Sequence, residues 1–502
     1  MKPPAPNLSL PARRRGWGRD ALVAFFSTLV LASVAPARAA AAPAEVSFMR
    51  DLAPVLAGCC TSCHGAIKEE GNVRLHTYER LTGGADPVVV SGHPEKSALL
   101  DRLLSADPEE RMPREDDALT PAQIDLFRRW IAAGAKFDGA DPKAPFKAQL
   151  GPREHPAAPT IYPTPVPVVA LALAPGGKEI AVGGYHEVTV WDVATGKLLR
   201  RLGHLPQKIQ SLAYSADGKQ LLVGGGTPGD YGELVLVDAA SGARLRVLDT
   251  FSDVVLAAVF RDDGRRVAAA SADQTVRAYD PADGRRLWSQ KLHADWATGV
   301  AFSPDQRYVA SSSKDKTVKI YDAETGELYT TYTGHNKMIG KYAGQNPVYA
   351  VKFVPGSPVA LSAGGGGWIQ LWEPEKAHDE NGTAADMEDR FKSAGHARYL
   401  AHGATQEVFA LAVGQGQVFA ATADGLVKQF DLEKLAEVRA YPGHSDWVYA
   451  LDYDATAGRL ATGDYSGEVR VWDTNTGACL VTFRAMPGEP AAARVVANQG
   501  GR

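Results

Sequence analysis

Short runs of alternating apolar and polar residues, separated by turns rich in glycine and aspartate, fill the chain from about residue 168 to 485. This alternation predicts half-buried strands. An aromatic or aliphatic residue followed by an acid recurs at the end of one strand per segment: Trp191-Asp192, Val237-Asp238, Tyr279-Asp280, Tyr321-Asp322, Trp372-Glu373, Phe430-Asp431 and Trp472-Asp473. The intervals are 46, 42, 42, 51, 58 and 42 residues. A four-stranded propeller blade takes ~40–45 residues, so the two longest intervals contain insertions.

Four Gly-His pairs accompany these segments: Gly203-His204, Gly334-His335, Gly395-His396 and Gly443-His444. Together with the strand-end acids they resemble the WD-repeat family over residues 168–485, which implies an all-β seven-bladed propeller. The resemblance further implies that His204, His293, His335 and His444 bond to turn aspartates such as Asp273, Asp315, Asp424 or Asp464 and lock a blade, and do not bind a metal. We expect residues 478–483 to supply the last outer strand, in preference to residues 160–162.

The segment 45–139 has a helical pattern instead. Phe48, Leu52 and Leu56 recur at helical spacing, and Pro94 opens a second helix that runs to about Leu104. Thr120 and Gln123 form a capping box for a third helix, which stops near Gly134. These elements predict a small all-α domain. Eight prolines between residues 141 and 167 favour extended conformations, so residues 140–167 are predicted to be a linker or a strap along a domain surface.

The chain carries Cys60-Thr61-Ser62-Cys63-His64, of the form Cys-x-x-Cys-His. Covalent haem attachment needs that spacing, because two thiols reach the two vinyl groups of one porphyrin and the adjacent imidazole ligates the iron. Only four cysteines occur in 502 residues, so a chance cluster is a poor explanation. We predict one haem c, bound covalently by Cys60 and Cys63 and ligated by His64. Cys59 leaves a second pairing open, since Cys59 with Cys63 gives Cys-x₃-Cys-His.

Electron transfer requires a second axial ligand, and Met112 is predicted to supply it from a loop between two helices. A thioether opposite histidine raises the reduction potential and suits electron transfer. His93 and His76 are the alternatives, and either would give a bis-histidine haem of lower potential. An open sixth position would indicate gas binding or peroxide chemistry instead.

Several short motifs extend beyond the haem motif: Cys60-Thr61-Ser62-Cys63-His64-Gly65, Gly71-Asn72-Val73-Arg74-Leu75, Ser97-Ala98-Leu99-Leu100, Arg111-Met112-Pro113 and Trp130-Ile131-Ala132-Ala133-Gly134-Ala135. With them, residues from about 48 to 139 resemble the single-haem cytochrome c domain common in planctomycete proteins. The resemblance implies Cys60 and Cys63 as haem anchors, His64 as proximal ligand and Met112 as distal ligand. His93 departs from that family, where a small polar residue is frequent at this position.

The N-terminus predicts export. Several arginines precede an apolar run over residues 21–34, and Ala37-Arg38-Ala39 follows as a cleavage site, so residues 1–39 are predicted to be a signal peptide. The 14-residue run is shorter than the ~18 residues of a stable span, which leaves an uncleaved signal as the only expected membrane contact. We expect a periplasmic or otherwise exported bacterial protein with a disordered tail at residues 486–502.

Charge excludes one class of partner. The whole chain has a net charge of −4, and removal of residues 1–39, which carry a net five positive charges, leaves the mature chain near −9. An acidic chain without a basic cluster is not expected to bind nucleic acid.

Two functions fit these features. The first is an exported c-type cytochrome that passes single electrons to a redox partner protein, with the propeller as a protein-docking platform. The alternative is a haem-linked periplasmic enzyme or sensor with an active site on the propeller face. Long insertions at residues 334–348 and 376–406 favour binding of partners or ligands, because propellers usually bind through such loops.

Overall fold

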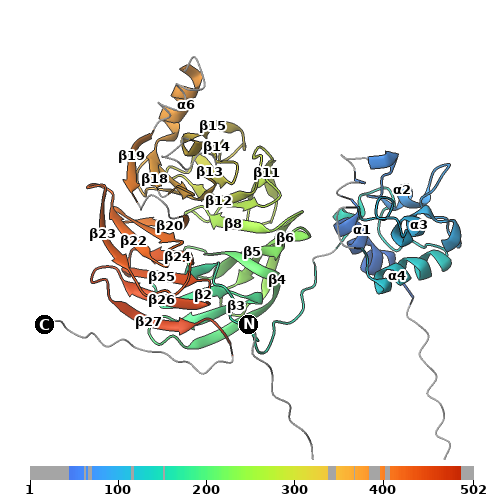
Figure 1. Ribbon diagram of the computed structural model, residues 1–502, viewed down its shortest axis with the longest axis horizontal. Helices are drawn as coiled ribbons and strands as arrows, with labels where there is room; N and C mark the ends of the chain where they lie inside the picture. The colour runs from blue at the N-terminus through green and yellow to red at the C-terminus, as the bar shows by residue number, and fades with distance from the viewer. Residues whose placement is uncertain are drawn as a thin grey trace, which may run out of the picture. The chain divides into compact units, whose positions relative to one another are not determined.

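The computed structural model describes residues 45–61, 64–65, 70–114, 118–150, 153–336, 346–366, 368–383, 396–401 and 407–487. The predicted signal peptide and most of the predicted tail lie outside these residues. Helices dominate the part before residue 150 and antiparallel sheets the part after residue 170 (Figure 1). No helix in the described ranges is long and apolar enough to cross a bilayer.

The helical part consists of short elements. They are the π-helix η1 (Phe48–Leu52), α1 (Ala53–Cys59), the 3₁₀ turn η2 (Glu70–Asn72), α2 (Tyr78–Thr82), the 3₁₀ turn η3 (Pro94–Lys96), α3 (Ala98–Leu104), α4 (Pro121–Ala132) and α5 (Phe146–Gln149). The predicted capping box is confirmed, because the Thr120 side chain accepts a hydrogen bond from Gln123 N while the Gln123 side chain accepts one from Thr120 N. Gly134 has φ 97° just past the end of α4, a conformation that favours glycine.

Aromatic rings form the centre of the helical core. Phe48 from η1 packs against Trp130 from α4, with ring centroids 5.2 Å apart, and edge-on against Phe146 from α5 at 5.8 Å. All three side chains are fully buried. Buried polar atoms of the core are paired as well: Tyr78 Oη donates to Ala135 O and Trp130 Nε1 donates to Lys136 O. Phe146 comes from the proline-rich segment, so the start of that segment contributes to this core.

The strands of the described residues form six hydrogen-bonded sheets, each antiparallel with neighbours in chain order. The first sheet contains β1 (Leu171–Leu173), β2 (Glu179–Gly183), β3 (Tyr185–Asp192), β4 (Leu198–Tyr214), β5 (Gln220–Thr227), β6 (Tyr231–Asp238) and β7 (Arg244–Phe251). The second and third contain β8 (Val255–Phe260), β9 (Val267–Ser271), β10 (Val276–Tyr279), β11 (Arg286–Gln290), and then β12 (Ala297–Phe302), β13 (Tyr308–Ser313), β14 (Val318–Asp322), β15 (Leu328–Tyr332).

The last three sheets follow the same four-stranded plan. They contain β16 (Val348–Phe353), β17 (Ala360–Gly364), β18 (Trp368–Trp372), β19 (His396–Ala401); β20 (Val408–Gly414), β21 (Gln417–Thr422), β22 (Val427–Asp431), β23 (Ala436–Tyr441); and β24 (Val448–Asp454), β25 (Arg459–Asp464), β26 (Glu468–Asp473), β27 (Cys479–Arg484). A 3₁₀ turn, η4 (Gly334–Asn336), follows β15, and a helix, α6 (Pro374–Thr383), follows β18.

The sheets pack one after another around a common centre, as in a β-propeller (Figure 1). Apolar residues of each sheet share a buried cluster with the next sheet, and the last sheet shares one with the first. At that closing contact Trp191 stacks on Phe483 with centroids 4.8 Å apart. Because β27 is the outer strand of the last sheet, the expectation that residues near 478–483 supply it is confirmed.

The first sheet has seven strands because β4 is continuous. Its first half pairs with β3, for example Arg200 opposite Val190, and its second half pairs with β5, for example Leu212 opposite Val223. One strand therefore serves as the outer strand of one four-stranded unit and the inner strand of the next.

The strand-end acids predicted the strands well, because the seven pairs fall at the ends of β3, β6, β10, β14, β18, β22 and β26. One Gly-His prediction is wrong. His396 begins the outer strand β19 and pairs with Trp372. Gly334-His335 and Gly443-His444 instead follow an outer strand, and Gly203-His204 lies within β4 where its pairing with β3 gives way to its pairing with β5. The insertion that precedes β19 shifted the position of this pair in the repeat.

The second half of the proline-rich segment lies against the first sheet. His155 Nε2 bonds to Glu233 Oε2 at 2.6 Å, and both side chains are at most 1% exposed. Tyr162 Oη donates to Glu187 Oε1 at 2.5 Å, and Arg201 Nε donates to Glu187 Oε2 at 2.6 Å. Two buried carboxylates are thus each satisfied by this segment and by an arginine of β4 or β7. This part of the proline-rich segment, residues 153–162, is called the strap below, and it agrees with the prediction of a strap along a domain surface.

Candidate functional site

The haem motif begins at the end of α1. Cys60 N donates to Leu56 O at 3.0 Å, and His64 N donates to Cys60 O at 2.9 Å, so backbone bonds anchor both Cys60 and His64. Cys59 and Cys60 are both half-buried and pack against the helical core. Cys63 lies outside the described residues. The structure therefore describes Cys60 and His64 of the three predicted motif residues.

The ring of His64 is oriented by its neighbour. His64 Nδ1 lies 3.2 Å from Val73 O. A carbonyl oxygen only accepts, so Nδ1 carries the proton and donates, which leaves the lone pair on Nε2. Iron-ligating histidines are commonly held in this way, with one ring nitrogen donating to a carbonyl and the other facing the metal. The donor set of His64 fits a haem ligand.

Met112 is held in the loop between α3 and α4. Its backbone N–H donates to Arg102 O at 2.9 Å, which fixes it beside the end of α3, and its side chain is half-buried. These contacts place the backbone of Met112 without testing what its sulfur binds, so its role as distal ligand stays a prediction.

The two alternative ligands differ sharply in environment. The side chain of His93 is 51% exposed, and its Nδ1 lies 3.0 Å from Glu95 Oε1. His76 is half-buried, and its Nδ1 is buried with no hydrogen-bond partner among the described residues. Burial, followed by the charges of Arg74 and Arg80, lowers the pKa of His76. An unsatisfied buried nitrogen is costly without a ligand, so His76 is the stronger of the two alternatives.

The histidines of the propeller region have structural bonds. His444 Nδ1 bonds to Asp464 Oδ2 at 2.9 Å and its Nε2 to Thr462 Oγ1 at 2.7 Å, and Trp472 Nε1 donates to the same hydroxyl. His293 likewise bonds to Asp315 and Ser311. These two confirm the predicted partnership with a turn aspartate. Among the described residues, His444, Asp464 and Glu468 alone come close enough together to hold a metal, but both nitrogens of His444 are already bonded.

His204 and His335 do not follow that pattern. His204 Nδ1 bonds to the carbonyl oxygen of His155, and His335 Nε2 bonds to Ser362 Oγ. For these two the predicted aspartate bond is wrong. A carbonyl oxygen of the strap is the partner of His204 Nδ1, while His335 keeps a hydroxyl bond like that of His293 to Ser311 but has no aspartate partner among the described residues. Burial lowers the pKa of His335 to about 3, so the buried ring is neutral.

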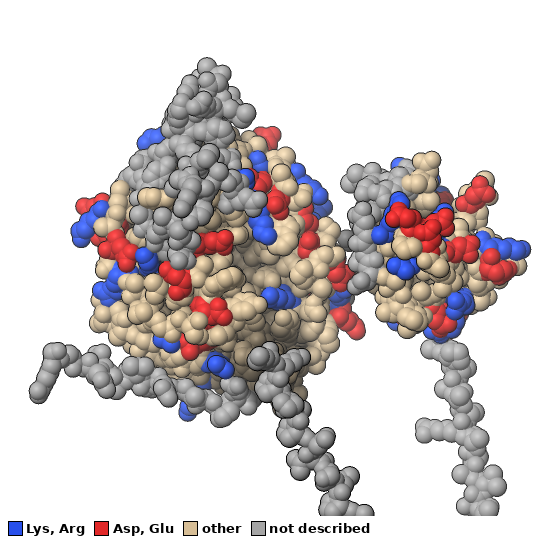
Figure 2. Space-filling model, in the orientation of Figure 1, with Lys and Arg blue, Asp and Glu red and all other residues tan. Residues whose placement is uncertain are grey.

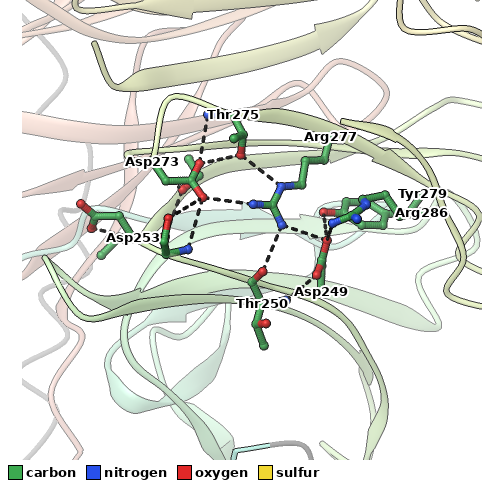
Figure 3. Close-up of polar contacts among 11 residues, drawn as sticks. Asp249, Thr250, Asp253, Asp273, Thr275, Arg277, Tyr279 and Arg286 are labelled. Atoms are coloured by element: carbon green, nitrogen blue, oxygen red, sulfur yellow. Dashed lines mark hydrogen bonds and ion pairs between the residues drawn. The ribbon is translucent and has the colours of Figure 1, made fainter. Parts of the chain in front are cut away.

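At the turn between β9 and β10, Asp273 bonds to an arginine-centred network in place of a histidine (Figure 3). Asp273 accepts hydrogen bonds from the hydroxyls of Ser252 and Thr275 and from Arg277 Nη2. Arg277 Nη1 also donates to Asp249 Oδ2 at 3.0 Å, and Tyr279 Oη donates to the same oxygen. Asp249, Asp273, Arg277 and Tyr279 are bonded to one another in this network, which indicates a structural role.

The His293–Asp315 bond yields a stability prediction. Burial alone would raise the pKa of Asp315, but hydrogen bonds from His293 and Thr317 outweigh it and hold this pKa well below its ordinary value. A depressed carboxyl pKa contributes stability above the unfolded value of about 3.9 that is lost as the pH falls through the folded value. We expect Asp315→Asn to lower the free energy of unfolding by about 2 kcal/mol at pH 7 and to make it fall less steeply between pH 5 and pH 3. Urea unfolding followed by circular dichroism at both pH values measures this.

The matched control is Asp283→Asn, because the Asp283 side chain is 58% exposed. It should change stability by less than about 0.5 kcal/mol. Equal losses in the two variants would show that the buried bond is not the cause.

A cavity of about 200 Å³ lies among the inner strands of the propeller region. Residues of β1, β4, β8, β12, β16, β20 and β24 line it, Lys352 among them. Lys352 and Asp452 are half-buried and occupy the same position, the fifth residue, in β16 and β24. Burial lowers the pKa of Lys352, while the charge of Asp452 raises it. The sequence analysis missed this pair, although charged residues at one fixed position of two inner strands are a signal that could have found it.

The fold and the cysteine–histidine motif together define a small helical haem-type domain joined to a propeller-type domain. Family models agree: residues 60–116 match Planctomycete cytochrome C, residues 184–289 and 272–423 match Outer membrane protein assembly factor BamB, and residues 435–473 match WD domain, G-beta repeat. The chain carries a planctomycete-type cytochrome c domain fused to a domain of the propeller type. A cytochrome c domain implies haem, and propeller domains of the WD type generally mediate protein–protein interactions.

Curated relatives match parts of the chain. A segment of 49 residues, 10% of the chain, is 41% identical to mitochondrial division protein 1 of Phaeosphaeria nodorum and covers 7% of that protein. A segment of 149 residues, 28% of the chain, is 28% identical to THO complex subunit 6 of Arabidopsis thaliana and covers 41% of it. The chain spans less than half the length of either relative.

Proposed function

We propose that this protein is an exported c-type cytochrome that transfers single electrons through one covalent haem, with its propeller as a docking platform for proteins. The observation that carries the proposal is the placement of His64, whose backbone N–H donates to Cys60 O and whose ring is held by Val73 O with Nε2 left for iron. Cys60 and His64 lie within the region that matches a cytochrome c family model.

In this proposal Cys60 and Cys63 would hold the haem through thioether bonds, and His64 Nε2 and the Met112 sulfur would ligate its iron. The haem supplies one-electron chemistry when bound. The chain's own part is to hold the imidazole in one tautomer and to exclude water: Phe48, Trp130 and Leu75, each at most 4% exposed, belong to the core against which Cys60 packs. A dry, apolar surround favours a higher reduction potential.

We also infer the organisation of the chain. Residues 1–39 are the signal peptide, 45–139 the cytochrome c domain, 140–167 the linker, 168–485 the propeller and 486–502 the tail, with α5 at the start of the linker packed into the core of the cytochrome c domain. The propeller has seven blades if β4 is counted in two of them. Export is supported by the N-terminal charge and hydropathy pattern and by the outer-membrane description of one matching family model.

A second candidate function is a haem-linked enzyme or sensor. The cavity between the inner strands favours it, because Lys352 lines this cavity and the charge of Asp452 acts on the Lys352 amine. An open sixth coordination position on the iron would support this candidate function.

The test is an absorption spectrum of the exported protein, oxidised and reduced, with a haem stain after denaturing electrophoresis. We expect covalent haem and a weak band at about 695 nm in the oxidised form, which indicates histidine–methionine ligation. Met112→Ala should remove that band and lower the reduction potential by the order of 100 mV. An unchanged low-spin spectrum would exclude Met112.

His76→Ala is the comparison variant for that outcome, because His76 is the buried alternative. If Met112→Ala has no effect and His76→Ala removes the low-spin spectrum, the haem is bis-histidine. A native spectrum that is high-spin and shifts with carbon monoxide would favour the enzyme or sensor.

A further inference from the structure

Five aromatic side chains from three neighbouring sheets form a continuous surface, called here the aromatic patch: Tyr349, Phe409, Trp447, Tyr449 and Tyr465. Phe409 is at its centre, with ring centroids 5.8 Å from Tyr349, 6.0 Å from Trp447 and 4.5 Å from Tyr449. Tyr465 extends the patch, 5.9 Å from Tyr449, and its backbone N–H donates to Trp447 O.

The strands place this patch at one mouth of the internal cavity. Tyr349, Phe409 and Tyr449 are each the second residue of an inner strand, β16, β20 and β24, and all three line the cavity. Trp447 directly precedes β24, and Tyr465 directly follows β25. The rings are therefore held by the scaffold of three sheets.

The patch is open to solvent although it is aromatic. Trp447 is 50% exposed and Tyr465 51% exposed. Exposed aromatic clusters of this kind are typical of binding sites, because rigid rings offer a large contact area at low entropic cost. About half of each of these two rings is thus left uncovered by the described part of the chain.

Two carboxylates give the patch its charge preference. Glu407 directly precedes β20 and Asp446 directly precedes Trp447. Burial raises the pKa of Tyr349 to about 12, and the charge of Glu407 adds to it. Burial also raises the pKa of Tyr449, with Tyr465, Asp446 and Glu407 as further causes. Neither carboxylate has an ion-pair partner among the described residues, so the rings lie in a negative potential. Aromatic faces beside unpaired carboxylates attract cations.

Lys352 limits how deep such a cation would bind. It lies three residues beyond Tyr349 on the same strand, in the cavity wall. Its positive charge would repel a second cation at that depth, so the favourable position is at the level of the rings.

Using these observations, we propose that the aromatic patch binds a lysine or arginine side chain presented by an exposed segment of a partner protein. This inference rests on the proposed docking role of the propeller and specifies the chemistry of the partner. A protein side chain is favoured over a phosphocholine headgroup, because Glu407 and Asp446 would repel the phosphate next to that ammonium group.

Trp296 provides a matched control within the chain. It directly precedes the inner strand β12, follows Asp295 as Trp447 follows Asp446, and is 41% exposed. Its ring is already occupied, however, since Lys314 Nζ lies 3.5 Å from the ring centroid. A partner's cation would therefore gain little at Trp296.

The experiment uses the mature, haem-loaded chain and fluorescein-labelled glycine–serine octapeptides that carry three lysines, three glutamates or three extra serines. Fluorescence anisotropy at low and at physiological salt measures binding. We expect the lysine peptide to bind at least tenfold more tightly than the other two. Trp447→Ala should weaken its binding about tenfold, and Trp296→Ala should leave it unchanged.

Glu407→Gln combined with Asp446→Asn tests the charge separately. The amide introduced at position 446 would keep an oxygen for the bond that Trp447 N now donates to Asp446 Oδ1, so this variant remains informative if Trp447→Ala misfolds. We expect it to weaken lysine-peptide binding about tenfold and to flatten its salt dependence.

Three outcomes overturn the inference: equal binding of the lysine and glutamate peptides, equal losses in Trp296→Ala and Trp447→Ala, or tighter binding to phosphatidylcholine vesicles that Trp447→Ala abolishes. Haem staining separates this inference from the electron-transfer proposal. Lysine-peptide binding by a protein without covalent haem would contradict electron transfer alone, whereas intact haem without such binding would contradict the aromatic patch alone.

Discussion

The Cys60→Ala variant should lose at least nine-tenths of its covalently bound haem, whereas Cys59→Ala should keep it. Both thiols are half-buried at the end of α1 and pack on the same core, so access alone does not distinguish them. Their spacing from Cys63 distinguishes them, because only Cys60 is separated from Cys63 by the two residues that match the two vinyl groups of a porphyrin. Haem-stained gels and the intact mass of the exported chain provide the measurement.

The opposite result has a definite meaning. Loss of haem in Cys59→Ala with retention in Cys60→Ala would establish the Cys-x₃-Cys-His pairing. Loss in neither variant would show that Cys63 alone holds the haem, or that attachment is not through this motif.

Phe146→Ala should destabilise the helical domain by about 3–5 kcal/mol. Phe146 is fully buried and touches Phe48 edge-on, and its backbone N–H donates to His76 O. Removal of the ring leaves a cavity at the centre of the aromatic core. Hydrogen exchange of the amides of α4, followed by mass spectrometry, reports this domain independently of the propeller.

Ile161→Ala is the control from the same proline-rich segment, because Ile161 is 73% exposed. It should leave exchange in α4 unchanged. If the α4 amides of the Phe146→Ala variant exchange as slowly as those of the unsubstituted protein, residues beyond 140 are not part of the helical domain's core.

The sequence identified the helical elements with a local signal and missed those without one. Thr120 and Gln123 predict the start of α4 because a capping box is a pattern of neighbouring residues. Phe146 is a single aromatic residue among prolines, and nothing near it along the chain indicates burial. Its partner Phe48 lies almost a hundred residues away, so only tertiary packing places it.

Repeat patterns predicted strands more reliably than side-chain partners. Each strand-end acid terminates a strand because the strand length is local, but the partner of each histidine depends on the adjacent sheet. His293 and His444 find their aspartates, while His204 meets the strap and His335 meets Ser362. The aromatic patch was not predicted for the same reason, since its rings converge from three sheets.

For the haem site, the motif indicates the chemistry and the structure adds orientation. The motif names Cys60, Cys63 and His64, and the bond from His64 Nδ1 to Val73 O adds the tautomer. On the side of the propeller region that Figure 2 shows, acidic and basic side chains are interspersed.

The contacts between successive sheets are not equal in strength. Where the first two four-stranded units meet, β4 passes through both as one strand, so they can separate only if its hydrogen bonds break. At the other junctions the chain runs directly from the outer strand of one sheet to the inner strand of the next, as from β7 to β8. Where the last sheet meets the first there is no such chain connection, and closure depends on side chains such as Trp191 and Phe483 and on a few bonds such as Val168 N to Asp464 O. The ring thus has one reinforced joint and one seam, and a strain on the propeller would open it at the seam.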